Sequence, residues 1–301
     1  MNQRNHRSSP DPSGDRQELP LSVWMGAQQP AQFQRRGRYL AASTAHPAKM
    51  LPAIAARAIA TFTAPGDVVF DPMCGIGTTL IEAVHQGRDG LGVEYEPRWA
   101  VIAQANLEMA YAAGATGRGR VVRGDARRLP DLLAQEEDAV GRVGLLLTSP
   151  PYGDSVHGQV RSSRDTGHAG VVKSDHRYGQ DRANLAHRPL PQLLAAFTEI
   201  LAASVPLLRP GGVVAITARS FRRDGRLIDF SDQVWHAAQQ AGLEPVQRLV
   251  ALLCGTRDGG LVTRASFFHM LETRRARAAG TPLHVLAHED VLILKLPGGR
   301  G

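Results

Sequence analysis

Two short stretches of this chain hold residue types that could do chemistry, and the first is a glycine turn that begins at Asp71. Glycines at positions 75 and 77 let the backbone turn tightly and approach a ligand without interference from a Cβ atom. The turn lies between a short apolar run and a helical pattern, and ligands bind at the carboxyl ends of strands in such sheets. The third glycine of the dinucleotide fingerprint is absent, and so is the Gly-Lys-Ser/Thr of a phosphate loop. Taken alone, the stretch also fits a plain strand-to-helix turn.

Two further carboxylates follow the next two predicted strands. Glu94 ends the strand 90–94, at 23 positions after Asp71, and Asp125 follows the strand 121–122. Glu94 could accept hydrogen bonds from both hydroxyls of a ribose, and Asp125 could accept one from the amino group of adenine. A single acid at a strand end is commonly only a helix cap, but three in register line one sheet edge. We therefore predict a nucleoside cofactor bound by Asp71, Pro72, Cys74, Gly75, Gly77, Thr78, Glu94 and Asp125.

The second stretch runs from Thr148 to Tyr152 and follows an almost wholly apolar strand over 143–148. Its two prolines, Pro150 and Pro151, fix φ and stiffen the turn. Adjacent prolines also mark ordinary surface turns, but the position directly after a buried strand favours a functional motif. With Ser149 ahead of the prolines, the motif resembles the Asp/Asn/Ser-Pro-Pro-Tyr/Phe signature of nucleic-acid amino-methyltransferases.

The resemblance is closest to the DNA methyltransferases that modify cytosine N4, within a superfamily that includes the adenine-N6 enzymes. The loop from Asp71 to Thr79 is similar both to those enzymes and to the transfer-RNA guanine-N2 methyltransferases. His46, Pro47 and Lys49 resemble a segment that packs beside the cofactor in this superfamily. The likeness covers about residues 35 to 296 and implies S-adenosylmethionine as the cofactor, with no metal.

The resemblance implies a role for each motif residue. The lone pair of an exocyclic amine is delocalised into the base, so the amine is a poor nucleophile. Ser149 Oγ and the Pro150 carbonyl would accept its hydrogens, and the stiff turn at Pro151 would keep both acceptors aimed at it. Tyr152 would stack on a base extruded from its helix. Ser149, Pro150, Pro151 and Tyr152 are therefore the predicted catalytic residues.

The elements that must position these motifs alternate between strand and helix. The predicted strands are 68–71, 90–94, 121–122, 143–148 and 213–217, and the predicted helices are 52–62, 78–86, 98–113 and 190–208. Apolar strands alternating with helices indicate a parallel sheet covered on both faces. Two late strands, 246–254 and 290–296, should close the sheet as an antiparallel pair at its edge. We expect a doubly wound α/β domain, the Rossmann-like fold of class I S-adenosylmethionine-dependent methyltransferases, with an antiparallel edge strand.

Three segments are too polar for the core of this domain. Residues 1–33 are predicted to be a disordered tail, which leaves 34–301 as the methyltransferase domain. Polar inserts are expected at 153–188 and 255–284, because loops this long are usually functional or disordered. The first contains His157, His168, His176 and His187, whose spacing fits no zinc site and favours solvated side chains.

The net charge of +7 and the pI near 10.0 favour a polyanionic partner. Arginine supplies 32 of the 35 basic residues, so the charge also fits a coding bias. Two basic clusters could nevertheless contact phosphates. The predicted nucleic-acid-binding residues are Arg35, Arg36, Arg38 and Lys49 in the first cluster and Arg274, Arg275 and Arg277 in the second.

The two cysteines, Cys74 and Cys254, form neither a disulfide framework nor a zinc pattern. We predict no membrane-spanning stretch, and the N-terminus has no signal-peptide core. A cytoplasmic location without membrane contact is therefore expected.

Three functions remain open from the sequence. DNA cytosine-N4 methylation is the first, because Ser149 stands where the guanine-N2 enzymes usually carry an acid. Transfer-RNA guanine-N2 methylation is the alternative, although those enzymes carry a separate RNA-binding domain. The third is a non-catalytic nucleic-acid-binding protein that retains the fold. A large target-recognition domain is absent, so the two inserts would have to select the substrate.

Overall fold

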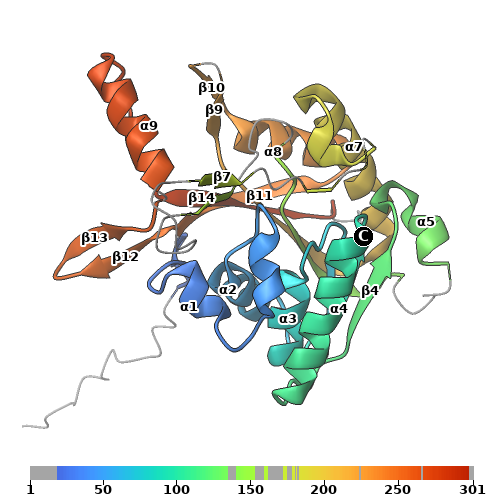
Figure 1. Ribbon diagram of the computed structural model, residues 1–301. Helices are drawn as coiled ribbons and strands as arrows, with labels where there is room; N and C mark the ends of the chain where they lie inside the picture. The colour runs from blue at the N-terminus through green and yellow to red at the C-terminus, as the bar shows by residue number, and fades with distance from the viewer. Residues whose placement is uncertain are drawn as a thin grey trace, which may run out of the picture.

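Within the described residues, the apolar runs of the sequence form an eight-stranded sheet in the computed structural model (Figure 1). The structure describes residues 19–134, 140–152, 159–161, 172–174, 178–179, 181, 183–223, 225–265 and 267–297. From edge to edge the strands are β1 (Val23–Met25), β11 (Glu244–Leu252), β14 (His288–Lys295), β8 (Leu208–Ala218), β5 (Val143–Thr148), β2 (Val68–Asp71), β3 (Asp89–Glu94) and β4 (Gly119–Arg123). All of them are parallel except β14, which is antiparallel to both of its neighbours.

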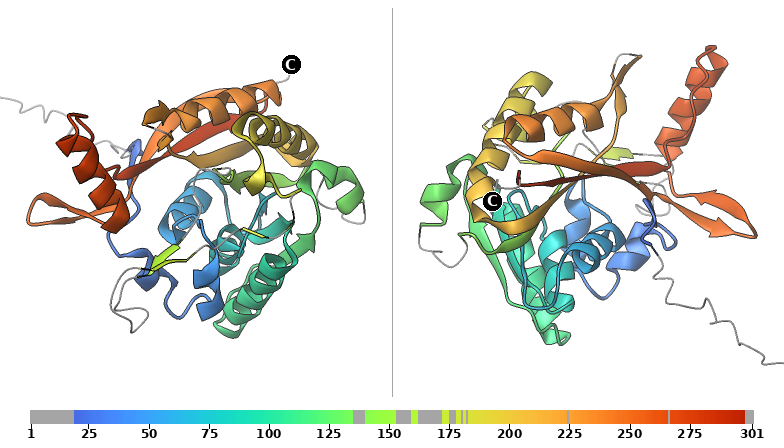
Figure 2. Two further views of the ribbon diagram at one scale, coloured as in Figure 1. Left: turned by 45° about the horizontal axis from the view of Figure 1, so that its top comes forward. Right: turned by 180° about the vertical axis from the view of Figure 1, so that it is seen from behind.

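Helices cover both faces of this sheet (Figure 2). One face carries α2 (Pro52–Phe62), α3 (Thr78–His85) and α4 (Pro97–Ala112), and the other carries α5 (Leu129–Leu132), α7 (Leu190–Ser204) and α8 (Phe230–Gln240). The short helix α1 (Ala31–Arg35) precedes α2. The predicted doubly wound α/β fold is confirmed.

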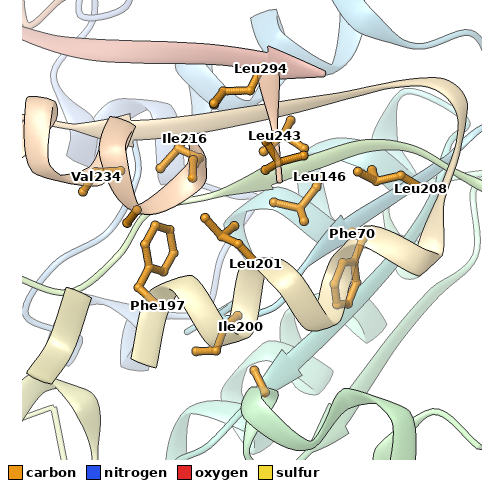
Figure 3. Packing of buried hydrophobic residues seen from close by; sticks show 14 of the residues in the cluster. Phe70, Leu146, Phe197, Ile200, Leu201, Leu208, Ile216, Val234, Leu243 and Leu294 are labelled. Atoms are coloured by element: carbon orange, nitrogen blue, oxygen red, sulfur yellow. The ribbon is translucent and has the colours of Figure 1, made fainter. Parts of the chain in front are cut away.

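The packing of α7 shows why the sequence folds in this way. Leu193, Phe197 and Leu201 recur every four residues, so they form one apolar stripe along the helix. Figure 3 shows Phe197 and Leu201 directed at Leu146 and Ile216 of the sheet. Each such buried side chain contributes roughly 1.5–3 kcal/mol relative to an exposed one.

The strand order reverses between β2 and β5. From β2 the chain proceeds to β3 and β4 on one side, and from β5 it proceeds to β8 on the other. Because β2 and β5 are neighbouring parallel strands, the segments that follow them meet at one edge. Such reversal points are where α/β sheets bind ligands. The fold therefore brings the two sequence motifs together, although about 70 residues separate them.

The predicted antiparallel pair exists, but its position at the edge was wrong. β14 lies between β8 and β11, and β1 is added outside β11. Val291 to Leu294 of β14 are all buried, with side chains in the clusters on both faces. A strand with such a continuous apolar run is suited to the interior of a sheet. β8 begins at Leu208, the last residue of the predicted helix 190–208, and it includes Arg209 to Gly212.

The N-terminal boundary also differs from the prediction. Residues 1–18 lie outside the described part, but β1 falls within the predicted tail of 1–33 and pairs in parallel with β11. Trp24 is buried in the cluster beneath α2, where its ring centre lies 6.3 Å from that of Phe62. This aromatic packing and the strand pairing hold the segment against the domain.

The two predicted inserts contain secondary structure. In the first, β6 (Gln159–Arg161) pairs with β7 (Val172–Ser174), whereas His157, His168 and His176 lie outside the described residues. In the second, β12 (Cys254–Arg257) and β13 (Gly260–Thr263) form a hairpin, and α9 (Phe267–Ala278) follows it. The β12–β13 hairpin and α9 both project from the body of the molecule (Figures 1 and 2).

A membrane-spanning length does occur in the chain, contrary to our reading of the sequence. Leu190–Leu207 is long and apolar enough by length and composition to cross a bilayer. In the structure this stretch comprises α7 and the turn after it, and its apolar stripe packs on the sheet. The hydrophobicity of the stretch is therefore accounted for by core packing.

Candidate active site

A cavity of about 460 Å³ opens at the reversal point of the sheet, a size in the usual range for small-molecule sites. It is lined by the segments that follow β2, β3, β4, β5 and β8, together with residues 46–51 and part of the first insert. Seven of the eight predicted cofactor residues, with the exception of Gly77, line it, and so do all four predicted catalytic residues. The two motifs thus share one cavity.

Asp71 fixes the shape of the glycine turn. Its Oδ1 accepts hydrogen bonds from Thr148 Oγ1 at 2.8 Å and from the Met73 amide at 3.1 Å, and its Oδ2 accepts one from Thr79 Oγ1 at 2.7 Å. Burial raises the pKa of this carboxyl to about 6. Because Thr148 is also the last residue of β5, Asp71 couples the glycine turn to the strand that carries Ser149.

The glycines adopt the conformations that the sequence suggested. Gly75 and Gly77 have φ of +56° and +83°, in the left-handed region that favours glycine. A Cβ at Gly75 would lie 3.0 Å from the His46 ring, and a Cβ at Gly77 would lie 3.0 Å from Ile81. Gly77 also precedes the first turn of α3. The turn therefore has room for backbone alone at both positions.

Glu94 lies at the end of β3 with its carboxylate facing the turn. Its Oε2 accepts a hydrogen bond from the Gly75 amide, and its Oε1 accepts one from the Glu96 amide, both at 2.8 Å. Burial raises the pKa of Glu94 to about 7. The carboxylate keeps further acceptor capacity toward the cavity, as a ribose diol requires.

Asp125 is held by an arginine of the following turn. Arg127 donates from both Nε and Nη2 to the carboxylate, which lowers the pKa of Asp125. Asp125 Oδ1 also caps that turn by accepting from the Arg127 amide at 3.0 Å. Asp125 therefore lies at the cavity wall where it was predicted, as a carboxylate that is already paired.

The motif after β5 is continuous with an aromatic cluster. The ring centre of Tyr152 lies 5.1 Å from that of Phe230 and 5.9 Å from that of Phe221. The guanidinium carbon of Arg219 lies 5.7 Å from the Tyr152 centroid. Tyr152 thus packs against the protein and borders the cavity, next to a half-buried Ser149.

The segment with His46 and Lys49 forms the opposite wall of the cavity. The His46 ring meets Trp99 at 4.7 Å and Tyr178 at 5.4 Å, and burial lowers its pKa to about 3, so this histidine is neutral. Lys49 Nζ donates to the carbonyls of His46 and Thr44. Burial and the nearby Arg35 lower the pKa of Lys49 to about 8. Lys49 therefore borders the cavity and is no part of an exposed basic strip.

The first predicted phosphate-contacting cluster is wrong for two of its arginines. Arg35 is only 8% exposed, and its guanidinium donates to Thr78 Oγ1 at 3.2 Å and to the Met50 carbonyl. Arg38 forms an ion pair of 2.7 Å with Glu82. Both side chains instead contact buried residues of α3, and Arg36 is the exposed arginine of this group.

The second cluster lies on α9. Arg274, Arg275 and Arg277 are exposed, and Arg277 donates to the Leu283 carbonyl at 3.0 Å. Because α9 and the β12–β13 hairpin follow the end of β11, they extend from the same sheet edge as the cavity. This position is compatible with the predicted contact to a nucleic acid.

The residues at the cavity that the sequence analysis missed include Trp99, Tyr178, Arg219 and Glu289. Trp99 donates from its indole to the Tyr178 carbonyl, which ties the first insert to the start of α4. Arg219 directly follows β8 and Glu289 lies near the start of β14. A charged residue close to one end of an apolar run was the available signal for both.

Comparisons with known proteins agree with the two motifs. The family described as DNA methylase (N6_N4_Mtase) matches residues 2–105, about a third of the chain. The type II methyltransferase M.BglI of Bacillus subtilis is 31% identical over 101 residues, which cover 32% of this chain and 27% of that protein. A transfer-RNA (guanine(10)-N2)-dimethyltransferase of Methanocaldococcus jannaschii is 36% identical over 112 residues, covering 36% and 30%. The predicted resemblance to nucleic-acid amino-methyltransferases is confirmed.

These matches are partial. The chain spans less than a third of the length of either curated relative. Among solved structures, a precorrin-6y C5,15-methyltransferase of Geobacter metallireducens matches with a TM-score of 0.46 and 10% identity, covering 91% of this chain and 97% of that one. The fold assignment therefore rests on the strand order itself.

Proposed function

We propose that this protein belongs to the nucleic-acid amino-methyltransferases and transfers a methyl group to an exocyclic amine of a base. S-adenosylmethionine is the cofactor, and the residues of the cavity suit its parts. Glu94 offers a carboxylate to the ribose hydroxyls, and the turn at Gly75 admits the cofactor close to the backbone. Lys49, a partly buried cation at the opposite wall, suits the carboxylate of the methionine part.

One observation carries the proposal: the glycine turn and the Ser149 motif line a single cavity and are joined through Asp71. The cofactor supplies an electrophilic methyl group on a sulfonium ion. The chain supplies position, because a near-attack geometry can account for much of the rate. Ser149 Oγ and the Pro150 carbonyl accept the hydrogens of the amine and hold its nitrogen toward the methyl group.

For the substrate, we propose duplex DNA and the amino group of cytosine. Ser149 in front of the two prolines supports cytosine, and the match to the DNA methylase family supports DNA. The archaeal relative that acts on transfer RNA favours the alternative, guanine N2. Contact with DNA would come from the arginines of α9 and from Arg36. Two free, buried cysteines are compatible with a reducing, cytoplasmic location, which we also propose.

The decisive test is the identity of the methylated nucleoside. The protein is incubated with S-adenosylmethionine that carries a labelled methyl group and with separate pools of unmethylated DNA and transfer RNA, and nucleosides are then analysed by mass spectrometry. We expect N4-methylcytosine from DNA. N2-methylguanosine from transfer RNA with unmodified DNA would replace our substrate with the alternative. Absence of cofactor binding in calorimetry would instead indicate a non-catalytic binding protein.

A further inference from the structure

Arg219 and Glu289 both line the cavity, and the register of β8 and β14 places them opposite each other. β8 and β14 pair antiparallel, with Ala218 opposite Asp290 as the last pair. The next pair in the same register is Arg219 opposite Glu289. Side chains in such a cross-strand pair lie on one face, with Cβ atoms about 5 Å apart. Both residues line the cavity, as does Tyr152 of the catalytic motif.

Glu289 differs from the other carboxylates at the cavity. Asp71, Glu94 and Asp125 each accept hydrogen bonds described above, and Glu96 accepts one from Asn184 at 2.6 Å. Within the part of the chain that the structure describes, the Glu289 carboxylate accepts none. It is therefore a carboxylate in a protein cavity with its acceptor capacity unused, which is costly for stability unless a substrate provides the partner.

The proposed reaction needs such a group. An exocyclic amine that gains a methyl group becomes positively charged and must lose a proton. Ser149 Oγ and the Pro150 carbonyl can accept hydrogen bonds, but a neutral hydroxyl or a carbonyl is far too weak a base to keep a proton. We propose that Glu289 is a catalytic residue that receives the proton released by the target amine, an inference that rests on the proposed function.

The step balances without a further reactant. The amine nitrogen forms a bond to the methyl carbon as the carbon–sulfur bond breaks, and the electron pair of that bond returns to sulfur. The N–H bond of the resulting cation then breaks, its electrons stay on nitrogen, and the proton goes to the Glu289 carboxylate. Exchange of this proton with solvent then restores the carboxylate.

Arg219 is the positioning residue for this carboxylate. Burial raises the pKa of Glu289 and the like charge of Asp290 raises it further, whereas Arg219 lowers it. The other titratable or charged groups around this pair include Tyr152, Tyr178 and Arg264, which line the cavity, Asp290, and His269 of α9, whose pKa is lowered by burial and by Arg219. Arg219 thus favours the ionised carboxylate, the form that a proton acceptor needs.

The test compares rates and pH profiles of the full chain. Single-turnover methyl transfer is measured from pH 5 to 9 on whichever nucleic acid pool the wild-type protein modifies. Glu289→Gln should lower the rate by about 10²-fold or more and remove the acidic limb of the profile, while Glu289→Asp restores part of the rate. Calorimetry should show that these variants bind S-adenosylmethionine within about twofold of the wild-type affinity, which corresponds to a difference in binding free energy of roughly 0.4 kcal/mol.

Two further variants should move the acidic limb in opposite directions. Arg219→Ala removes the cation that lowers the pKa of Glu289, so the limb shifts to higher pH. Asp290→Asn removes the like charge, so the limb shifts to lower pH, and its rate at neutral pH stays within about threefold as the matched control.

The outcomes separate this inference from the function beneath it. Three results would overturn the role of Glu289 and leave the proposed function intact. These are a Glu289→Gln rate equal to wild type, an acidic limb that persists in that variant, and acidic limbs that shift in the same direction in Arg219→Ala and Asp290→Asn. Loss of cofactor binding in Glu289→Gln would do the same, because it would assign the residue to the cofactor site. A wild-type protein that modifies neither pool overturns the proposed function, and the role of Glu289 with it.

Discussion

Ser149 is held at the cavity by a strand end that is itself anchored, since the preceding Thr148 donates to buried Asp71. Ser149→Ala should therefore remove one acceptor without moving the turn. Loss of a preorganised hydrogen-bonding group typically costs about 2.7–4 kcal/mol of barrier, so transfer should fall roughly 10²- to 10³-fold. Single-turnover transfer of a labelled methyl group measures the effect, and unchanged S-adenosylmethionine affinity is the control. Near-normal transfer would place the active site elsewhere.

The two buried carboxylates, Asp71 and Glu94, give the cofactor-free protein an unusual response to pH. Their folded pKa values, about 6 and about 7, lie above the ordinary values of 3.8 and 4.5. Between those values the folded state binds more protons than the unfolded state, so stability falls as pH rises. From pH 5.5 to pH 7.5 the loss should be on the order of 2 kcal/mol.

Urea denaturation at several pH values measures that loss, and Glu94→Gln is the matched variant because its amide does not titrate. The variant should show a shallower decline over the same range. A wild-type stability that increases from pH 5.5 to pH 7.5 would contradict the burial of these charges.

Residues near local motifs were predictable, and residues that depend on distant pairing were not. Asp71 and Glu94 could be found because each is the last residue of an apolar strand, in consecutive strand–helix units. Arg219 and Glu289 are 70 positions apart and become neighbours only through the antiparallel register of β8 and β14. Arg35 and Arg38 were misassigned because the sequence shows their charge but not Thr78 and Glu82, the partners that hold them.

At the scale of elements, the link between β2 and α3 depends on the space around Gly77. Gly77 and Gly114 have nearly the same backbone, with φ of +83° and +88°. A Cβ at Gly77 would meet Ile81 at 3.0 Å and Ala103 at 3.2 Å, whereas nothing lies within 4 Å at Gly114. Alanine at either position should cost about 1 kcal/mol or more of backbone strain. Gly77→Ala should cost more and should also weaken S-adenosylmethionine binding.

Thermal unfolding and calorimetry of the two alanine variants give the comparison. Equal destabilisation with unchanged cofactor affinity in both would show that the turn after β2 tolerates a side chain and would weaken its assignment to the cofactor.

Elements defined by a local pattern were placed well. The predicted bounds of α2, β2 and β5 agree with the structure, because an apolar run and a following turn residue define each one. The position of β14 was not predictable in this way. Its apolar run suits the middle of a sheet, but the run does not say which two strands it separates.

For the whole molecule, the exposed arginines of the second basic cluster lie on an extension of the domain, formed by the β12–β13 hairpin and α9. Arg274, Arg275 and Arg277 lie on α9, which projects from the body of the molecule (Figure 1). If they neutralise phosphates, the slope of log affinity against log salt should decrease by about 0.9 for each contact removed. Fluorescence anisotropy with labelled duplex DNA, at salt concentrations from about 50 to about 200 mM, measures this slope for the triple alanine variant and for wild type.

Arginines away from α9 provide the control. Arg57 on α2 and Arg118 before β4 are exposed, and Arg118 pairs with Asp89 at the opposite ends of the strands. Replacing both by alanine should leave the slope unchanged. If the triple variant of α9 has the same salt slope as wild type, these three arginines do not contact phosphates.

The place of β14 has a consequence for how the chain folds as it is synthesised. β4, β3, β2, β5 and β8 can pair as soon as residue 218 has emerged, whereas the neighbours of β11 in the sheet are β1 and β14. Until residues 288–295 are available, β8 and β11 both expose unpaired edges, which favour intermolecular association. β1 pairs with β11, which lies more than 220 positions later in the chain. This pair of strands can join the rest of the sheet once β14 has formed. Glu289 therefore reaches the cavity only when β14 completes the sheet. A nascent chain can form the glycine turn well before the cavity contains Glu289.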